Sequence, residues 1–489
     1  MKRTRLLLCV ALLALGQPAR ANVKVAGMFG ANMVLQRSAA IPIWGWAGKG
    51  EKVTVAFNGA TNAAVADENG KWMVKLGPFP AGGPYTMTIA GSNTLTIGNI
   101  LVGDVWLASG QSNMQWPLSK MDHAEREAAH ADYGSFRFMT LHGTAREPAA
   151  NVSGSWVVCS PATAPDFSAP GFFFGRALHT ALKVPIGVIN TSEGSSAARC
   201  WISAGTQLAN PFFKEALEEY KTFPARKQAY MEAVAKAKAA GTQPPSHVPF
   251  FEAYTDVPGF LYNARIHPLA PFGIKGVIWY QGENEALFRH GRVYKDQFPA
   301  LIQNWRELWG QGDFPFLYVQ LQPFGGRRQT PAESEWAEVR DGQRQTLKVK
   351  NTGMVVTTDI CDPALHPVKK AELGKRLALA ARAIAYGEKV EYSGPLFDKA
   401  EFKDGRATVS FTHVGGGLVA KGGKLEGFAI AGADSAFVWA DAEISGNRVI
   451  VRSAKVPAPR AVRYAWADNP VGTLFNQEGL PASCFRTGE

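Results

Sequence analysis

Between residues 102 and 387 the chain alternates short apolar runs with longer stretches of helical character. The apolar runs have the length of strands and lie at 102–108, 186–192, 276–282, 314–321 and 353–360. Helical stretches lie between and after them, at 171–183, 293–309, 337–349 and 368–387. Strand–helix alternation of this kind produces a parallel sheet with helices on both faces. The pattern therefore predicts a three-layer α/β domain over residues 99–390.

The segments on either side of this domain have β character. Apolar or alternating runs at 53–57, 71–76 and 85–90 are separated by turn pairs such as Asn58-Gly59 and Asn69-Gly70. We therefore expect an N-terminal β-sandwich over residues 22–98. Strand-like runs return after Glu391 and predict a C-terminal β-sandwich domain over residues 391–489.

One segment interrupts the strand–helix alternation. Residues 204–248 are rich in Ala, Lys and Glu and end in a Pro-containing stretch. This composition predicts a helical insertion, which is either a solvated helix pair or a lid.

The first 21 residues have the form of a secretory signal peptide. Basic residues at positions 2, 3 and 5 precede an apolar run, and Ala19-Arg20-Ala21 forms a small-x-small cleavage site. The apolar run is too short to span a membrane, and no later run reaches the necessary length. We expect the mature chain to be periplasmic or secreted.

Charge and cysteine spacing exclude other classes of partner. The formal net charge is +11, of which the signal peptide contributes four units, and no basic run carries interleaved aromatic residues. Nucleic acid is therefore not an expected partner. The mature cysteines are too widely separated for a finger or ribbon metal site, and no metal is expected. Disulfides and isolated buried thiols both remain open for Cys159, Cys200, Cys361 and Cys484.

Polar clusters follow several of the predicted strands. Gln111, Ser112 and Asn113 follow the run at 102–108 after Ser109 and Gly110, and further clusters occupy 192–196, 281–285 and 361–367. Because the carboxyl ends of parallel strands meet at one edge of a sheet, these clusters should share a pocket. A serine at such an edge is a nucleophile when a base reaches it. The alternative is a polar turn in which Ser112 only caps the next helix.

His366 is the best candidate for the base. Pro367 suits the first turn of the predicted helix, which places His366 at the N-terminal boundary of that helix. The helix dipole would keep the imidazole neutral there, and Asp362 is positioned to hold its second nitrogen. The alternative is that His366 only caps the helix. The main competitor, His267, has no acid near it in the sequence.

Acyl transfer also needs hydrogen-bond donors for an oxyanion. Gly194 can bring its backbone N–H close to a ligand because it has no side chain. Gln281 and Asn284 offer amide N–H groups from the neighbouring strand end. Turn chemistry is the alternative for both amides.

Several blocks of the sequence resemble the sialate O-acetylesterase family, a branch of the SGNH-hydrolase superfamily of GDSL-like esterases. The blocks include GQSNMQWPL (110–118), PIGVINTSEGSSAARCWIS (185–203), GVIWYQGENEA (276–286), LHPVKK (365–370) and GLPASCFRT (479–487). The resemblance implies an SGNH-type catalytic domain. It also implies that Ser112 is the nucleophile and His366 the base, with no cofactor. The oxyanion donors it implies are Ser112, Gly194 and either Gln281 or Asn284.

The sequence departs from the family pattern at the acid. The superfamily often carries this acid three residues before the histidine, where the chain has Pro363. Asp362 and Asp359 are the substitutes, and a Ser-His dyad is the third possibility.

The resemblance implies an exported serine esterase that removes O-acetyl groups from a sugar, with sialic acid as the expected substrate. Acetylxylan or another polysaccharide is the alternative substrate. A second alternative is a carbohydrate-binding protein without catalysis, which turnover of a simple acetyl ester would exclude. The sequence leaves the oligomeric state open.

Overall fold

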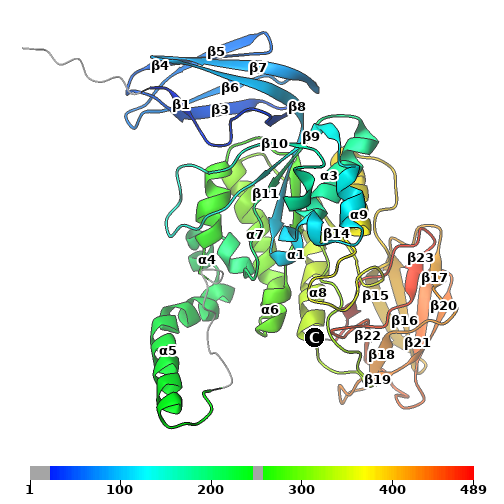
Figure 1. The fold of residues 1–489 in the computed structure, drawn as a ribbon. Helices are drawn as coiled ribbons and strands as arrows, with labels where there is room; N and C mark the ends of the chain where they lie inside the picture. The colour runs from blue at the N-terminus through cyan, green and yellow to red at the C-terminus, as the bar shows by residue number, and fades with distance from the viewer. Residues whose placement is uncertain (1–21, 246–256, 489) are drawn as a thin grey trace, which may run out of the picture.

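The protein consists of a β-sandwich, an α/β domain and a second β-domain, in chain order (Figure 1). A computed structural model describes residues 22–245 and 257–488. The predicted signal peptide at 1–21 lies outside the described residues. The sandwich packs above the α/β domain in the view of Figure 1, and the C-terminal domain lies at its lower right.

The α/β domain is built on a twisted central sheet. In spatial order its strands are β10 (Val157–Cys159), β9 (Tyr133–Thr140), β11 (Ile186–Asn190), β8 (Thr94–Gly110), β12 (Gly276–Tyr280), β13 (Phe316–Val319) and β14 (Thr352–Val355). Neighbours from β9 to β14 pair in parallel, whereas β10 pairs with β9 antiparallel at the edge. The predicted α/β architecture is therefore confirmed, and the edge strand makes the sheet mixed.

Helices cover both faces of this sheet. Residues of α3 (Ala169–Leu182) and α9 (Ala371–Tyr386) pack on one face, and residues of α7 (Tyr294–Trp309) and α8 (Glu335–Gln345) pack on the other. The alternation along β8 sends Trp106 to the first of these cores and Leu107 to the second. Three short helices complete the domain, namely α1 (Ser112–Gln115), α2 (Ala124–Ala129) and α6 (Glu283–Leu287).

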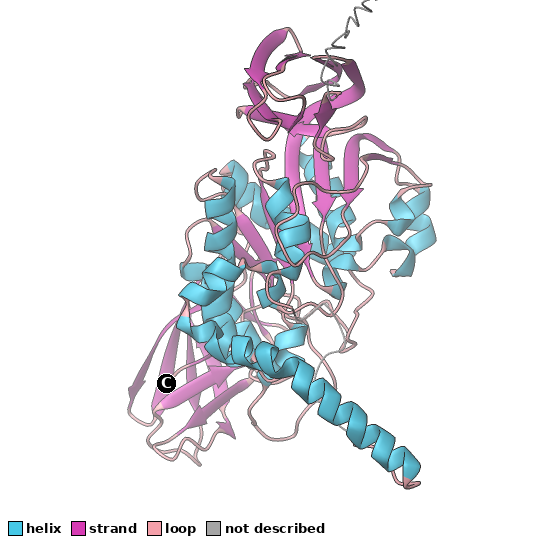
Figure 2. Ribbon diagram, turned by 90° about the vertical axis from the view of Figure 1, so that its left-hand side faces the viewer, coloured by secondary structure: helices cyan, strands magenta, loops and turns pink. Residues whose placement is uncertain are grey.

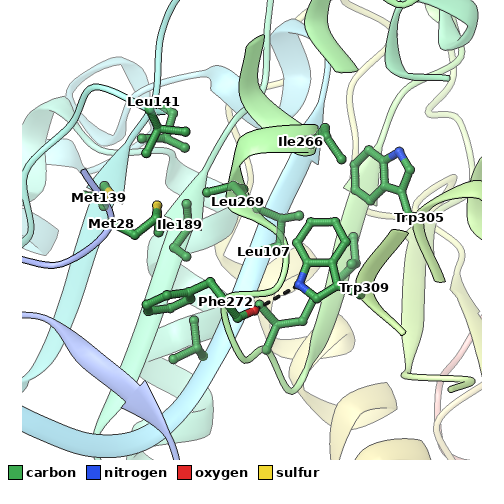
Figure 3. Close-up of a cluster of buried hydrophobic side chains, with 14 of the residues drawn as sticks. Met28, Leu107, Met139, Leu141, Ile189, Ile266, Leu269, Phe272, Trp305 and Trp309 are labelled. Carbon is green, nitrogen blue, oxygen red and sulfur yellow. Dashed lines mark hydrogen bonds between the residues drawn. The ribbon is translucent and has the colours of Figure 1, made fainter. Parts of the chain in front are cut away.

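The core on the α7 side continues into the N-terminal sandwich. Figure 3 shows Met28 from the sandwich near Met139 and Ile189 of the central sheet. In the same cluster the indole N–H of Trp309 donates to the carbonyl of Phe272 at 2.9 Å. The two domains thus share one apolar core.

The sandwich also shares a strand with the α/β domain. One of its sheets contains β1 (Lys24–Val25), β3 (Ile41–Trp46) and β6 (Lys71–Leu76); the other contains β4 (Lys52–Phe57), β5 (Ala60–Val65), β7 (Gly82–Ala90) and the first part of β8. A further strand, β2 (Val34–Gln36), pairs in parallel with β8. Strand β8 has 17 residues and crosses the predicted boundary between 98 and 99. Its last residue, Gly110, lies two positions before Ser112, the candidate nucleophile.

The C-terminal domain consists of antiparallel strands around its own core. They are β15 (Leu396–Lys403), β16 (Arg406–Thr412), β17 (Leu418–Ala420), β18 (Phe428–Ala431), β19 (Val438–Trp439), β20 (Asp441–Ser445), β21 (Arg448–Arg452), β22 (Ala461–Tyr464), β23 (Leu474–Asn476) and β24 (Phe485–Arg486). The fully buried guanidinium of Arg340, on α8, donates to the carbonyls of Ala467 and Asp468 at 2.6 and 2.8 Å. It also donates to the carbonyls of Leu321 and Gln322, so it ties this domain to the loop after β13.

The predicted insertion is largely helical in its described part. It contains α4 (Ala204–Ala209) and the long, mostly exposed α5 (Lys214–Ala239), which projects from the body of the molecule in Figure 2. Its last residues, 246–248, lie outside the described residues. Within 22–245 and 257–488, no helix is both long and apolar enough to cross a membrane. The free thiols among the described residues are Cys159, Cys200, Cys361 and Cys484.

Candidate active site

The candidate nucleophile stands where β8 turns into α1. The turn requires glycine at position 110, whose φ is +131°, and a Cβ there would lie 2.1 Å from the carbonyl oxygen of Tyr280. Ser112 is the first residue of α1. The local sequence therefore delivers Ser112 to the carboxyl-end edge of the sheet, where the sequence pattern predicts it.

Ser112 meets His366 at this edge. Their Oγ and Nε2 atoms are 2.9 Å apart, although the residues are separated by 254 positions in the chain. A serine hydroxyl within hydrogen-bond reach of an imidazole is the arrangement of an activated nucleophile. The structure thus brings together the two residues that the sequence suggests for nucleophile and base.

The loop that carries His366 differs from its prediction in one respect. Helix α9 begins at Ala371, so Pro367 lies in the loop and not in the first helical turn. Lys370, and not His366, is the N-cap of the helix, so the sequence argument that places His366 at the helix boundary does not hold.

Burial and nearby lysines keep the imidazole neutral. Burial lowers the pKa of His366, and the positive charges of Lys370 and Lys120 lower it further. The ring is stacked on the indole of Trp116, with ring centroids 4.2 Å apart and planes 13° apart. Stacking fixes the plane of the ring, which a base that must address one hydroxyl requires.

Neither candidate acid is bonded to the imidazole. Asp362 accepts a hydrogen bond from the backbone N–H of Ala364 at 3.1 Å. Asp359 forms a two-pronged ion pair with Arg376, with both N···O distances at 2.7 Å. Among the described residues, no hydrogen bond joins His366 to a carboxylate. The role of Asp362 in catalysis stays a prediction.

Gly194 lies beside the nucleophile. A Cβ placed on Gly194 would be 3.7 Å from the Cβ of Ser112. The backbone N–H of Gly194 donates to Oε1 of Gln115 at 2.9 Å. An incoming carbonyl must therefore displace the Gln115 side chain before Gly194 can serve as an oxyanion donor.

The two candidate amides are already engaged in holding a turn. The side chain of Gln281 is fully buried and donates to the carbonyl of Ser196 at 3.1 Å and to the carboxylate of Glu285. That of Asn284 donates to the carbonyl of Ser195 at 2.8 Å. Both amides thus support the turn that carries Gly194, and their role as oxyanion donors stays a prediction.

The structure also shows polar residues that the sequence analysis missed. Behind Ser112 lies a buried network that includes Asn113, Glu283, Gln322 and Lys370. The available signal was position, because Asn113, Glu283 and Lys370 all fall in quoted sequence blocks. The competing histidine, His267, lines a separate cavity of about 330 Å³ between the sandwich and the α/β domain.

Comparison with known proteins identifies the family. The sequence model of the family described as "Carbohydrate esterase, sialic acid-specific acetylesterase" matches residues 102–383. The chain is also 32% identical to the sialate O-acetylesterase of Rattus norvegicus, over 90% of this chain and 88% of that protein. The chain belongs to the sialate O-acetylesterase family.

Other relatives agree with this assignment. The sialate O-acetylesterase of Homo sapiens is 32% identical over 78% of this chain and 75% of its own length. The crystal structure of a carbohydrate acetylesterase from Xanthomonas citri superposes with a TM-score of 0.82 and 38% identity, and covers 96% of this chain and 100% of that one. This member of the sialate O-acetylesterase family is a carboxylic ester hydrolase that acts on acetylated sugars.

Proposed function

We propose that the chain is an exported serine esterase with an SGNH-type catalytic domain, and that it removes O-acetyl groups from sialic acid through an acetyl-enzyme on Ser112. The observation that carries the proposal is the 2.9 Å contact between Ser112 Oγ and His366 Nε2 in a family of acetylesterases. The signal-like residues 1–21 support export.

The proposed reaction uses these groups as follows. As the Ser112 hydroxyl attacks the acetyl carbonyl, His366 Nε2 takes its proton. Once the Gln115 side chain has moved off the Gly194 N–H, the backbone N–H groups of Ser112 and Gly194, with an amide of Gln281 or Asn284, stabilise the oxyanion. When the tetrahedral intermediate collapses, the bond between the acetyl carbon and the sugar oxygen breaks, and the imidazolium gives its proton to that oxygen, which leaves as the sugar hydroxyl. Water, deprotonated by His366, then releases acetate and restores the serine.

The contacts of the two aspartates favour a Ser-His dyad over a triad. Asp359 is fully engaged by Arg376, and Asp362 bonds backbone in its own loop. In a triad the acid orients the ring through its second nitrogen. Here Trp116 holds the ring plane instead.

The dyad predicts an acid limb of kcat/KM below pH 6.5. The base must be neutral to accept the serine proton, and the lowered pKa of His366 keeps it neutral to a lower pH than an ordinary imidazole, whose pKa is about 6.5. Asp362→Asn should leave this limb where it is. A pH–rate profile of both proteins checks this. A limb at or above 6.5 that drops in Asp362→Asn would establish the triad instead.

The charge around the base supports an acidic sugar as substrate. Lys120 is exposed next to Trp116, with its ammonium 4.9 Å from the indole centroid, and its charge reaches His366. A carboxylate on the substrate complements this field, and sialic acid carries one. A neutral polysaccharide such as acetylxylan is the second candidate. It is kept because the Xanthomonas citri relative is described as a carbohydrate acetylesterase, a class that includes neutral sugars.

We expect kcat/KM to be higher for O-acetylated sialic acid than for acetylated xylo-oligosaccharide. In Lys120→Met the ratio of kcat/KM for the sialic acid to kcat/KM for the xylo-oligosaccharide should fall, because only the acidic sugar loses its electrostatic attraction to the Lys120 ammonium. Any effect of Lys120 on the base is common to both substrates and cancels in the ratio. The reverse preference would assign the chain to polysaccharide deacetylation. Failure to hydrolyse these sugars or p-nitrophenyl acetate would instead indicate a carbohydrate-binding protein.

A further inference from the structure

Asn113 bridges the segment of the nucleophile and the segment of the base. It follows Ser112 directly and is completely buried. Its side-chain Nδ2 donates to the carbonyl oxygen of Leu365 at 2.8 Å, and Leu365 directly precedes His366. One hydrogen bond therefore connects the backbone next to the base with the side chain next to the nucleophile, across 252 positions of sequence.

The amide of Asn113 is held in a single orientation. Its Oδ1 accepts from the ammonium of Lys370 at 2.6 Å, and its Nδ2 donates to a carboxylate oxygen of Glu283 at 2.5 Å. An ammonium only donates, and an ionised carboxylate only accepts. If the amide were flipped, its N–H groups would point at the Lys370 ammonium, and its oxygen would point at the oxygens of Glu283 and Leu365. Neither arrangement allows a hydrogen bond. The Lys370 ammonium on one side and the acceptor oxygens of Glu283 and Leu365 on the other thus set which end of the amide faces Leu365.

A second amide supports the same carbonyl. Gln322 donates to the Leu365 oxygen at 3.2 Å and to Glu283 at 3.1 Å. The hydroxyl of Tyr280 donates to Gln322 Oε1 at 2.6 Å, which fixes that amide too. The loop that carries His366 is thereby anchored to the ends of β12 and β13, two neighbouring strands of the central sheet.

We propose that Asn113 is the positioning residue for the base, and that Lys370 and Glu283 act through it by orienting its amide. The proposal rests on the proposed function, in which Ser112 and His366 carry the reaction. In a triad a carboxylate orients the imidazole directly. In this chain the hydrogen bond from Asn113 holds the backbone carbonyl of Leu365, the residue before His366, and stacking on Trp116 fixes the plane of the imidazole.

Lys370 gives the proposal a second, electrostatic signature. Its ammonium faces the ring of Tyr280 at 4.9 Å, and the charged or titratable groups that act on it are Cys361, Glu283 and Asp362. Burial lowers the pKa of Lys370 to about 8, so the ammonium is mostly charged at neutral pH. Lys370 and Lys120 are the charges that lower the pKa of His366. Removing Lys370 should therefore raise the pH of the acid limb, which a purely structural residue would not do.

The test compares three variants by steady-state kinetics, with active sites counted by titration with an organophosphorus fluoridate. Asn113→Ala should lower kcat about 10²-fold per titrated site, the cost of a small misplacement of a catalytic group, with KM within about threefold. Lys370→Met should lower kcat about tenfold, the scale of one charge-assisted hydrogen bond, and move the acid limb upward. The control is Lys369→Met, an exposed neighbour with the same change of charge, which should keep both kcat and the limb.

Two results would overturn the proposal. One is a kcat within about threefold of wild type in Asn113→Ala. The other is an acid limb that does not move in Lys370→Met. If either single variant folds poorly, Lys370→Met/Glu283→Gln decides, because it leaves neither buried charge unpaired: reduced kcat supports the proposal, and wild-type kcat overturns it. Ser112→Ala tests the proposed function separately. Normal turnover in that variant would show that the proposed function is wrong, whatever the Asn113 and Lys370 variants show.

Discussion

Replacing Ser112 by alanine should lower turnover of an acetylated sugar on the order of 10³-fold or more. The change removes the Oγ atom that lies 2.9 Å from His366 Nε2, and with it the only group placed to form the acetyl-enzyme in this account. The side chain is half-buried and its backbone starts α1, so alanine keeps the helix and the core. Thermal unfolding should therefore be nearly unchanged while kcat/KM collapses.

Ser109, on the strand that leads to Ser112, offers a matched control. It is buried, and among the described residues its hydroxyl has no hydrogen-bond partner. Ser109→Ala removes the same atom three positions earlier and should keep activity close to wild type. Near-normal rates in Ser112→Ala would contradict the mechanism, whatever the control shows.

Replacing His366 by alanine should cost nearly as much as replacing Ser112. A nucleophile and its base act as a unit, so the double variant should be little worse than either single one. Kinetics of the two single variants and the double variant measure this non-additivity. His267→Ala is the comparison, because His267 is the competing histidine and lines a different cavity. A larger loss in His267→Ala than in His366→Ala would overturn the assignment of the base.

The order of strands and helices in the α/β domain could be predicted because each central strand is an apolar run with both faces buried. Strand β9 was missed because Arg137, between Phe136 and Phe138, breaks the continuous apolar run expected of a central strand, although Arg137 is itself buried. The length of β8 was missed as well. Its first part alternates in burial as a sandwich strand does, and only its second part is continuously buried. One strand therefore carries two burial patterns, and a search for a single periodicity divides it into two separate segments.

The meeting of Ser112 and His366 could be predicted for a topological reason, because parallel strands bring their carboxyl ends to one edge. The hydrogen-bond partners of the polar side chains at this edge could not be predicted. Gln281 and Asn284 have the donors of an oxyanion site, but the carbonyls of Ser196 and Ser195 lie within their reach. Which acceptor an amide finds depends on the path of a neighbouring turn, and sequence spacing does not encode that path.

The same limit applies to the acid. Asp362 is close to His366 in sequence, yet its carboxylate bonds the backbone of its own loop. Asp359 is drawn to Arg376 on α9, a partner that only the folded packing supplies. The anchoring of Leu365 by Asn113 was likewise invisible, because the two residues are far apart in the chain.

Labelling with an organophosphorus fluoridate tests the central claim most directly. The reagent reacts with a serine that a neighbouring base activates, and peptide mass spectrometry locates the adduct. The account predicts one adduct per chain, on Ser112, with deacetylation of the sugar lost in proportion to labelling and no adduct in His366→Ala on the same timescale. Full labelling of Ser112 with activity retained, or complete inactivation with the adduct on another residue, would contradict it.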